Sequence, residues 1–176
     1  MIHGKTIYLR AFAKSDIPLS HTWLNDPELG SIMGYLPFPI EAQEAWFETT
    51  VNSREKFVFA ICDQATDQHV GNVAIGAIDA VSRNGMLSIF IAEPSIRGRG
   101  VGEDATRLIL DFAFDRLNLH RVHLKASAFS EAAIAMYKKV GFQKEGVLRE
   151  HEFKDGKYVD KVLFGLLRQE HQEGTE

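Results

Sequence analysis

A glycine-rich segment near the middle of the chain has the residue types that bind an anion. It reads Arg97-Gly98-Arg99-Gly100-Val101-Gly102, follows an apolar stretch that ends before Pro94, and leads into an amphipathic stretch with helical spacing. The first turn of a helix presents backbone N–H groups that have no intrahelical partner, and the helix dipole adds partial positive charge there. Because glycines let an anion approach the backbone and the arginines add full charges, we expect a phosphate or pyrophosphate site.

The spacing of these glycines argues against two common nucleotide motifs. Gly98-x-Gly100-x-Gly102 is not the G-x-G-x-x-G dinucleotide fingerprint, and the Gly-Lys-Ser/Thr ending of a P-loop is missing. Glu103 and Asp104 stand in the first helical turn and would repel a phosphate, so we expect both side chains to point away from the segment. A strand-to-helix turn without a ligand is the alternative.

The elements that must position this segment form one α/β (α+β) domain with a mixed sheet, because strands outnumber helices and hairpins alternate with helices. Alternating apolar residues predict strands over residues 6–12, 56–62, 69–78, 86–92, 121–126, 147–153 and 158–166. A first helix is expected between a cap at Ser15-Asp16 and Pro27. Further helices are expected over residues 41–51, 102–117 and 130–140.

Turn residues and apolar spacing add detail to these elements. Asn84-Gly85 and Asp155-Gly156 predict turns between strands, and Gly141 predicts the end of a helix. The inward face of the helix over 102–117 is expected at Ala105, Leu108, Ile109, Phe112 and Ala113. That of the helix over 41–51 is expected at Ala42, Ala45, Trp46 and Thr49.

The composition is typical of a globular domain in a reducing compartment. The chain has 176 residues, 45% of them hydrophobic and 25% charged, and its formal net charge of −4 argues against nucleic acid or an anionic membrane as a partner. Cys62 lies in an apolar stretch and is expected in the core. We expect a cytoplasmic protein with no signal peptide, no membrane span, no metal site and a frayed tail over residues 169–176.

The chain also resembles a known family along most of its length. Residues 97–102 match the Arg/Gln-x-x-Gly-x-Gly/Ala signature of the GNAT superfamily of N-acetyltransferases. Further likeness, especially to the branch of ribosomal-protein N-terminal acetyltransferases and spermidine acetyltransferase, lies in residues 23–26, 39–40, 117–122, 132–142, 143–149 and 156–160. The resemblance implies the GNAT-like fold, a central mixed, mostly antiparallel sheet flanked by helices, over a single domain of residues 1–176.

The resemblance implies acetyl-CoA as co-substrate and direct attack by a primary amine on its thioester in a ternary complex. In the family the glycine loop binds the pyrophosphate, and the preceding strand bulges and splays from the next one, so that the pantetheine arm fills the gap. Tyr137 stands at the position of the family's general acid, which protonates the departing thiolate; an ordinary phenol has a pKa near 10, comparable to that of a thiol. Contacts to the co-substrate are accordingly expected from Phe90, Ile91, Ala92, Arg97, Gly98, Arg99, Gly100, Val101, Gly102, Ser130 and Tyr137. Backbone N–H groups of the first three are the expected oxyanion donors.

Two positions depart from the family's pattern. Ser130 stands where many relatives carry an Asn that contacts the co-substrate; a serine is shorter but can still cap the helix. Met86 aligns with a Glu that serves as base or substrate contact in this branch, and a thioether cannot take a proton. The general base therefore stays open. The candidates are Glu28, Glu41, Glu44, His120 and His123, with Asn72 and Ser88 as residues that can hold a water; a water-relayed base or an already neutral amine is the alternative.

The acceptor amine is expected among the N-terminal helices, which shape its pocket in the family. Its candidate contacts are Trp23, Asn25, Glu28, Tyr35, Phe38 and Glu41. A surplus of carboxylates there would favour a polyamine or an aminoglycoside, and an open groove would favour a protein N-terminus; an amino sugar or an amino acid also stays open. A non-catalytic acyl-CoA-binding module is the alternative function, and the resemblance implies a homodimer.

Overall fold

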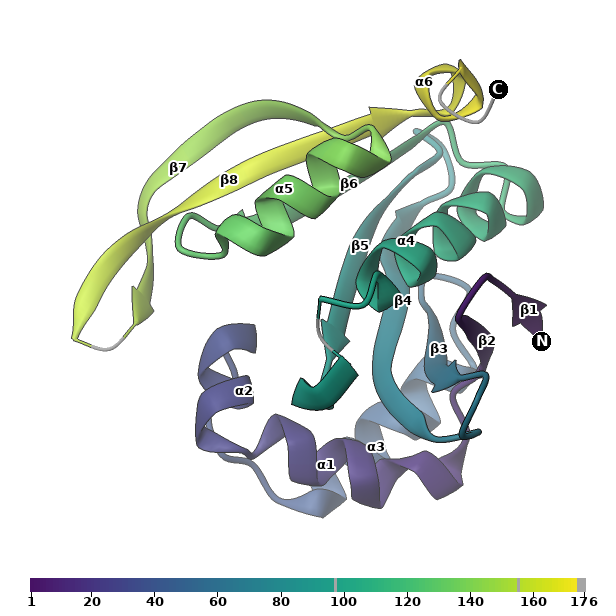
Figure 1. Cartoon of the computed structure of the whole chain (residues 1–176). Coiled ribbons are helices and arrows are strands. Elements are labelled where there is room, and N and C mark those ends of the chain that lie inside the picture. Colours follow the sequence, from purple (N-terminus) through teal and green to yellow (C-terminus); the bar gives the residue numbers. More distant parts are fainter. Residues whose placement is uncertain (97, 155, 174–176) are drawn as a thin grey trace.

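An eight-stranded sheet forms the centre of the computed structural model, which describes residues 1–96, 98–154 and 156–173 (Figure 1). The strand order is β1-β2-β3-β4-β5-β6-β8-β7. The strands are β1 Ile2–His3, β2 Ile7–Ala11, β3 Phe57–Asp63, β4 His69–Asp79, β5 Asn84–Ile91, β6 Arg121–Ser127, β7 Gln143–Lys154 and β8 Lys157–Leu167. Neighbouring strands are antiparallel except β5 and β6, which are parallel, so the expected mixed, mostly antiparallel sheet is confirmed.

The parallel pair β5–β6 comes apart soon after it begins. Its register ends with Met86 opposite His123 after three residue pairs, whereas β5 continues to Ile91 and β6 to Ser127. The two strands therefore diverge, as the family resemblance implied. Between Met86 and Ile91 the register of β5 with β4 is unbroken, and directly after it the N–H groups of Ala92 and Glu93 both donate to the carbonyl oxygen of Val70, at 2.8 and 3.4 Å, as in a β-bulge.

Helices lie on both faces of this sheet. They are α1 Ile17–Leu24, α2 Pro27–Met33, α3 Ile40–Val51, α4 Val101–Asp111, α5 Glu131–Val140 and α6 Arg168–Glu173. Figure 1 shows α4 and α5 in front of the sheet and α1, α2 and α3 gathered below it. Val73 and Ile75 of β4 pack in the core with α4, whereas Asn72 and Ala74 point to the other face and border a cavity with residues of α1 and α3.

The amphipathic helix α4 begins directly after Gly100. Its expected inward face is confirmed: Ala105, Leu108, Ile109 and Ala113 are at most 9% exposed, and Phe112 packs partly buried against them. After Asp111 the helix widens into a π-helical turn over Phe112–Arg116, so the predicted length is confirmed as well.

Pro27 begins a helix instead of only ending one. The sequence predicts that the first helix ends at Pro27, but a second helix, α2, begins at this residue. Proline is tolerated in a first helical turn because its missing N–H has no intrahelical partner there. Asp26 Oδ1 accepts hydrogen bonds from the N–H groups of Glu28 and Leu29 at 3.0 and 2.9 Å and so caps this helix.

The inward face of α3 also differs from the expectation. Gln43 is buried and Trp46 and Phe47 are partly buried, whereas Ala42, Ala45 and Thr49 are exposed. Of the expected side, Ala42 and Trp46 line the cavity between this helix and the sheet, whereas Ala45 and Thr49 do not. Small residues carry little apolar area, so the two aromatic rings decide which side of this short helix turns inward.

The turn predicted at Asn84-Gly85 is wrong, because both residues lie inside β5. The chain turns over residues 80–83 instead, where Asp79 Oδ1 accepts the N–H groups of Val81 and Ser82 at 2.8 and 2.9 Å. An aspartate that bonds to the following backbone is an equally effective turn former. The β7–β8 hairpin is present around Gly156, whose φ is 79°; Asp155 lies outside the described residues.

The predicted frayed tail is wrong over residues 169–173, which belong to α6. Glu170 Oε2 accepts the N–H of Leu167 at 2.8 Å and so holds the start of this helix. Residues 174–176 lie outside the described part of the chain. The placement of Cys62 in the core is confirmed by its 1% exposure.

Candidate active site

The glycine-rich segment keeps open space beside its backbone. Gly98 and Gly100 have left-handed φ values of 78° and 82°, which glycine adopts without strain. A Cβ atom added to Gly98, Gly100 or Gly102 would meet no other heavy atom within 4 Å. Gly100 directly precedes α4, so the N–H groups at the start of that helix can donate to an anion in this space. Arg99 is exposed beside it, and Arg97 lies outside the described residues.

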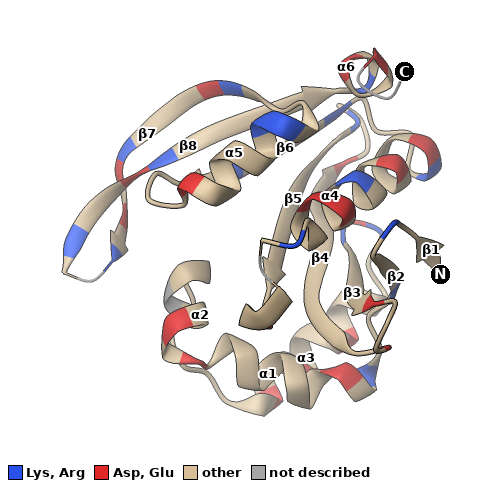
Figure 2. Cartoon of the chain, in the orientation of Figure 1, with Lys and Arg blue, Asp and Glu red and all other residues tan. Residues whose placement is uncertain are grey.

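The two carboxylates in the first turn of α4 point away from this space, as expected. Asp104 Oδ2 accepts the backbone N–H of Thr6 at 2.8 Å. Glu103 pairs with Lys139 at 2.7 Å and with Arg107 at 3.2 Å, and the hydrogen bond from Lys139 helps to hold the pKa of Glu103 below its usual range. Figure 2 shows acidic residues at the start of α4 and a basic residue on the segment before it. Neither carboxylate therefore opposes an anion at the glycines.

The backbone of β5 borders the gap between β5 and β6. The N–H of Ala92 donates to the carbonyl oxygen of Val70 in β4 at 2.8 Å. Backbone groups of an antiparallel strand alternate between its two neighbours, so Phe90 also faces β4, whereas Ile89 and Ile91 face the gap. Of the expected oxyanion donors, Ala92 and Phe90 thus turn to β4 and Ile91 turns to the gap. Ile89 faces the gap as well, which the sequence does not reveal because the direction of an N–H group depends on register.

Tyr137 is buried on α5 between two phenylalanine rings. It is 8% exposed, and its ring centroid lies 5.8 Å from that of Phe142 and 6.1 Å from that of Phe164. Burial raises the pKa of Tyr137 to about 12. The hydroxyl therefore stays protonated at neutral pH and can donate a hydrogen bond, but it is a weaker acid than the ordinary phenol considered in the sequence.

Ser130 stands directly before α5 without capping it. Its hydroxyl makes no capping hydrogen bond, so the expected cap is wrong. Its backbone makes the first hydrogen bond of the helix instead, since the carbonyl oxygen of Ser130 accepts the N–H of Ile134 at 2.9 Å. Gly141 ends the same helix with a left-handed φ of 115°, as expected.

A cavity of about 440 Å³ lies on the face of β5 that points away from α4. Its walls come from α1, α3, the end of α2 with the segment after it, and strands β3 to β5. Its polar lining residues, apart from the hydroxyl of Tyr35, are Ser20, Gln43, Lys56, Asn72 and Ser88. Large apolar residues form most of the remaining surface, among them Leu24, Met33, Phe38, Trp46 and Phe90. A volume of this size suits a small organic ligand.

Two of the six expected acceptor contacts line this cavity, Tyr35 and Phe38. The cavity lining does not include Trp23, Asn25, Glu28 or Glu41. Asn25 holds the loop around the cavity instead, since its Oδ1 accepts the N–H of Phe38 at 2.9 Å. The sequence missed Gln43 and Lys56, which lie on separate elements and read individually as surface residues.

The candidate bases and the two residues expected to hold a water separate into three groups. Asn72 and Ser88 line the cavity. Exposed positions outside the cavity lining hold Glu28, Glu41, Glu44 and His120. His123 lies opposite Met86 at the point where β5 and β6 diverge. Its neighbours Val122 and Leu124 are buried toward α4 and α5, so the imidazole points to the face of the sheet that carries the cavity. Burial lowers the pKa of His123, which keeps the ring neutral at pH 7.

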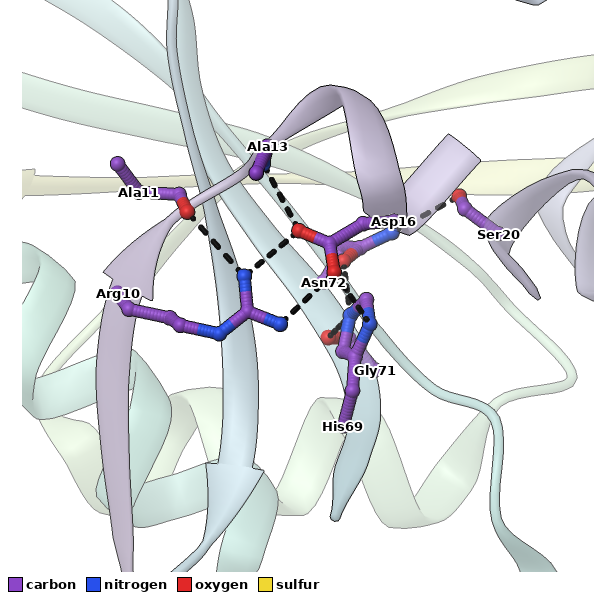
Figure 3. Close-up of polar contacts among 8 residues, drawn as sticks. All are labelled: Arg10, Ala11, Ala13, Asp16, Ser20, His69, Gly71 and Asn72. Carbon is purple, nitrogen blue, oxygen red and sulfur yellow. Dashed lines mark hydrogen bonds and ion pairs between the residues drawn. The ribbon is translucent and has the colours of Figure 1, made fainter. Parts of the chain in front are cut away.

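A buried polar network supports the floor of the cavity (Figure 3). Arg10 donates two hydrogen bonds to Asp16, at 2.6 and 2.8 Å, and Asp16 is only 6% exposed. His69 Nδ1 lies 3.6 Å from Asp16 Oδ1, and its Nε2 lies 2.8 Å from Asn72 Oδ1. Asn72 in turn donates to Ser20 Oγ at 3.0 Å. The network thus fixes Asn72 and Ser20, the two of its members that line the cavity.

Two features are absent from the described residues, a metal-binding cluster and a membrane-spanning helix. No group of three or more His, Cys, Asp or Glu side chains is arranged to hold a metal ion in residues 1–96, 98–154 and 156–173. Within the same residues, each helix is too short or too polar to span a bilayer.

Comparison with known proteins gives a consistent result. The family model described as an acetyltransferase (GNAT) domain matches residues 6–143. A prophage-derived uncharacterized N-acetyltransferase of Bacillus subtilis is 30% identical over 96% of this chain and 94% of its own length. The spermidine N(1)-acetyltransferase of Vibrio cholerae is 26% identical over 96% of each chain.

Solved structures show the same fold. The crystal structure of spermidine N-acetyltransferase from Vibrio cholerae, in complex with CoA and spermine, superposes with a TM-score of 0.89 at 24% identity, over 95% of this chain and 98% of that one. The resemblance inferred from the sequence is therefore confirmed over most of the chain. With the matched family model covering residues 6–143, the chain belongs to the GNAT family of N-acetyltransferases.

Proposed function

We propose that this protein transfers the acetyl group of acetyl-CoA to the primary amine of a small molecule, by direct attack in a ternary complex. One observation carries the proposal: the single strand β5 borders all three features that the reaction needs. The glycine segment follows its end, the gap to β6 runs along one edge, and the cavity lies on one face. An acyl group in the gap would therefore meet an amine in the cavity.

The co-substrate contacts of this proposal follow the same strand. The pyrophosphate would lie at the N–H groups of residues 98–102, with Arg97 and Arg99 as counter-charges. Val101 would contribute its backbone alone, because its side chain is 3% exposed and belongs to the core. Backbone groups of Ile89 and Ile91 would bond to the pantetheine arm and the thioester oxygen, as a strand partner would. Tyr137 would donate to the departing sulfur and Ser130 would contact the co-substrate nearby.

Acetyl-CoA should raise the midpoint of thermal unfolding. A ligand at about 100 times its Kd adds about 2.7 kcal/mol of stability, which is roughly 5 to 10 °C for a domain of this size. Arg99→Glu should abolish most of the rise, because a carboxylate would then face the pyrophosphate. Adenosine, NAD and ATP serve as ligand controls, and Lys144→Glu, on exposed β7, is the matched charge reversal.

The outcomes of this titration separate the candidate functions. No shift at millimolar acetyl-CoA would contradict the proposal. A shift without acetyl transfer to any amine would instead favour the non-catalytic acyl-CoA-binding module.

We infer that His123 is the general base for the amine. Met86 stands where relatives carry a glutamate, and His123 lies opposite Met86 on the neighbouring strand β6. Its imidazole is on the face of the sheet that carries the cavity, at the point where the gap opens. A water held by Ser88 would relay the proton, since Ser88 stands two residues beyond Met86 on the same face and lines the cavity. Because burial lowers its pKa, the ring is in the proton-accepting form at neutral pH.

Replacing His123 by glutamine should lower kcat about 10²-fold, the lower range for loss of a general base. In the unchanged protein, kcat/KM should fall on the acid side only below the ordinary histidine value of 6.5, because the pKa of His123 is lowered. The glutamine variant should lose this acid limb. His120→Gln, at an exposed position three residues away, is the matched control; an unchanged pH profile in the His123 variant would refute the assignment.

We further propose that the protein acts in the cytoplasm as a homodimer. The support for association is the β7–β8 hairpin, which extends away from the rest of the domain in Figure 1. Phe153 and Tyr158 near its tip are 65% and 68% exposed. Large apolar side chains on a projecting hairpin are typical of a surface that a partner covers.

A further inference from the structure

The charge of the cavity does not suit a polyamine. Among the described residues that line it there is no Asp or Glu, and Lys56 is the charged side chain present. A polyamine carries several ammonium groups, each of which needs a carboxylate or several acceptors when it leaves water. Lys56 would repel these groups. The cavity therefore differs from what the names of the spermidine-acetylating relatives would suggest.

Lys56 is a cation held against the cavity wall without a counter-charge. Its stem crosses Gly76, where an added Cβ would lie 3.3 Å from Lys56 Cγ, and its Nζ lies 5.0 Å from the ring centroid of Trp46. In the described part of the chain, no carboxylate lies within 4.0 Å of this ammonium. Burial lowers the pKa of Lys56, which reflects the cost of desolvating the charge. An anionic group on the ligand would offset that cost.

Gln43 is the second unsatisfied group in the cavity wall. It is 4% exposed, and among the described residues no donor reaches its Oε1. A buried amide oxygen without a donor costs about 1–3 kcal/mol, so such a group indicates a missing partner. Gln43 stands one turn before Trp46 on α3, and Trp46 contacts Lys56. The unpaired acceptor and the unpaired cation therefore lie near the same end of the cavity.

The rest of the cavity is apolar. Leu24, Met33, Phe38 and Phe90 line it, together with the aliphatic side chains of β3 and β4. A ligand that fits all three regions has an anion for Lys56, an N–H donor for Gln43 and an apolar group for this wall. A molecule that carries an amine, a carboxylate and an apolar side chain on one carbon atom satisfies that description.

We propose that the acceptor is an α-amino acid with a large apolar side chain. Its carboxylate pairs with Lys56 Nζ, its amine donates to Gln43 Oε1, and its side chain contacts the apolar wall. This inference rests on the proposed acetyltransferase function and narrows it to one substrate class.

The position of Lys56 places such an amine where the reaction would occur. Lys56 crosses Gly76, Gly76 pairs with Met86, and Met86 is the last residue of β5 joined to β6. In an α-amino acid the amine and the carboxylate share one carbon, so anchoring the carboxylate at Lys56 holds the amine beside the opening of the gap. The amine nitrogen then forms a bond to the thioester carbonyl carbon, the C–S bond breaks, and the coenzyme leaves as its thiol. The base takes the proton that the ammonium loses.

The test compares acceptors that differ in one group. Thiol release is measured with acetyl-CoA and L-phenylalanine, L-leucine or L-methionine, then with phenethylamine and isoamylamine, which lack the carboxylate, and with spermidine. We expect kcat/KM for the amino acids to exceed that of the matched amines by about 10- to 100-fold, the value of one charge-assisted contact. Spermidine should be a poor acceptor.

Lys56→Met removes the charge and keeps the length of the apolar stem. In this variant KM for phenylalanine should rise by the same 10- to 100-fold, while phenethylamine is used as well as before. Lys56→Arg should retain part of the preference. Lys144→Met, on the exposed surface of β7, is the control, and it should leave the kinetics with both acceptors unchanged.

Calorimetric titration of phenylalanine into the protein loaded with CoA separates this inference from the proposed function. If phenylalanine binds in a way that depends on Lys56 but is not acetylated, the inferred ligand class stands and the acetyltransferase proposal is overturned. Turnover of spermidine or phenethylamine in preference to the amino acids would overturn the acceptor class alone. Equal KM values for phenylalanine in the Lys56→Met variant and the unchanged protein would also overturn it.

Discussion

Replacing Tyr137 by phenylalanine should lower kcat by about 10²- to 10⁴-fold, the range for loss of a positioned proton donor. The ring keeps its packing against Phe142 and Phe164, so the midpoint of thermal unfolding and the affinity for acetyl-CoA should change little. The loss should appear in kcat more than in KM, because the hydroxyl acts on the departing sulfur and not on the bound amine. Steady-state thiol release at saturating acetyl-CoA measures it.

Burial of Tyr137 also predicts the shape of the pH profile. Its pKa is raised to about 12, so the hydroxyl stays protonated throughout the accessible range, and no alkaline loss of rate below about pH 11 should come from this residue. Tyr158→Phe is the matched control, because that hydroxyl is on the exposed hairpin. A Tyr137→Phe variant with an unchanged kcat would refute the role and favour direct departure of the thiolate.

Replacing Asp16 by asparagine should lower the free energy of unfolding by about 3 kcal/mol at pH 7. Removing one partner of a buried ion pair costs about 3–5 kcal/mol, and the side chain of Arg10 is 31% exposed, which places the effect at the lower end. Urea denaturation followed by circular dichroism measures the difference. A double variant with apolar residues at both positions should recover part of the loss, because it leaves no unpaired charge.

The same pair sets the acid sensitivity of the fold. Burial would raise the pKa of Asp16, but the hydrogen bonds from Arg10 and from the Ala13 N–H outweigh it and hold the pKa below its usual value. A carboxyl with a lowered folded-state pKa stabilises the protein above its unfolded pKa of about 3.9, and that stabilisation is lost as pH falls through the folded value. The difference in the free energy of unfolding between the unchanged protein and the Asp16→Asn variant should therefore be constant near neutral pH and should decrease below about pH 4.

An exposed ion pair provides the control for Asp16. Lys14 and Glu48 lie 2.9 Å apart with side chains 64% and 57% exposed, so Glu48→Gln should give no measurable change in stability. If Asp16→Asn unfolds at the same urea concentration as the unchanged protein, the buried network does not support the cavity floor as described.

Local patterns in the sequence predict the co-substrate side of the site well. The apolar face of α4 follows from spacing within one helix, and the outward direction of Glu103 and Asp104 follows from the repulsion between a carboxylate and an anion at the glycines. Such features depend on residues a few positions apart, where helical periodicity and dipole effects dominate. The family signature lies in the same segment, so fold and co-substrate class could be expected together.

The acceptor side could not be predicted in the same way. Gln43 and Lys56 both line the cavity but come from different elements, and each reads locally as an ordinary polar surface residue. The register of β5 with β4 decides which N–H groups of β5 face the gap. A sequence-based register would have been wrong by several residues, because Asn84-Gly85 predicts a turn and lies inside β5. Pro27 likewise begins a helix, because Asp26 caps it. The preferences of single residues do not decide whether a proline ends one helix or begins the next.

The short join between β5 and β6 has a consequence for how the domain opens. Three residue pairs, and the N–H groups of His120 and Arg121 that donate to Arg83, connect the strands β1 to β5 with the strands β6 to β8 through the backbone. The contact of α4 with α5 adds the bonds of Lys139 with Glu103 and Arg107. With so few shared hydrogen bonds, the two parts of the sheet should exchange their amide hydrogens as separate cooperative units with different opening free energies. A ligand that lies along the divergent strands bonds to both, and would make the two units unfold as one.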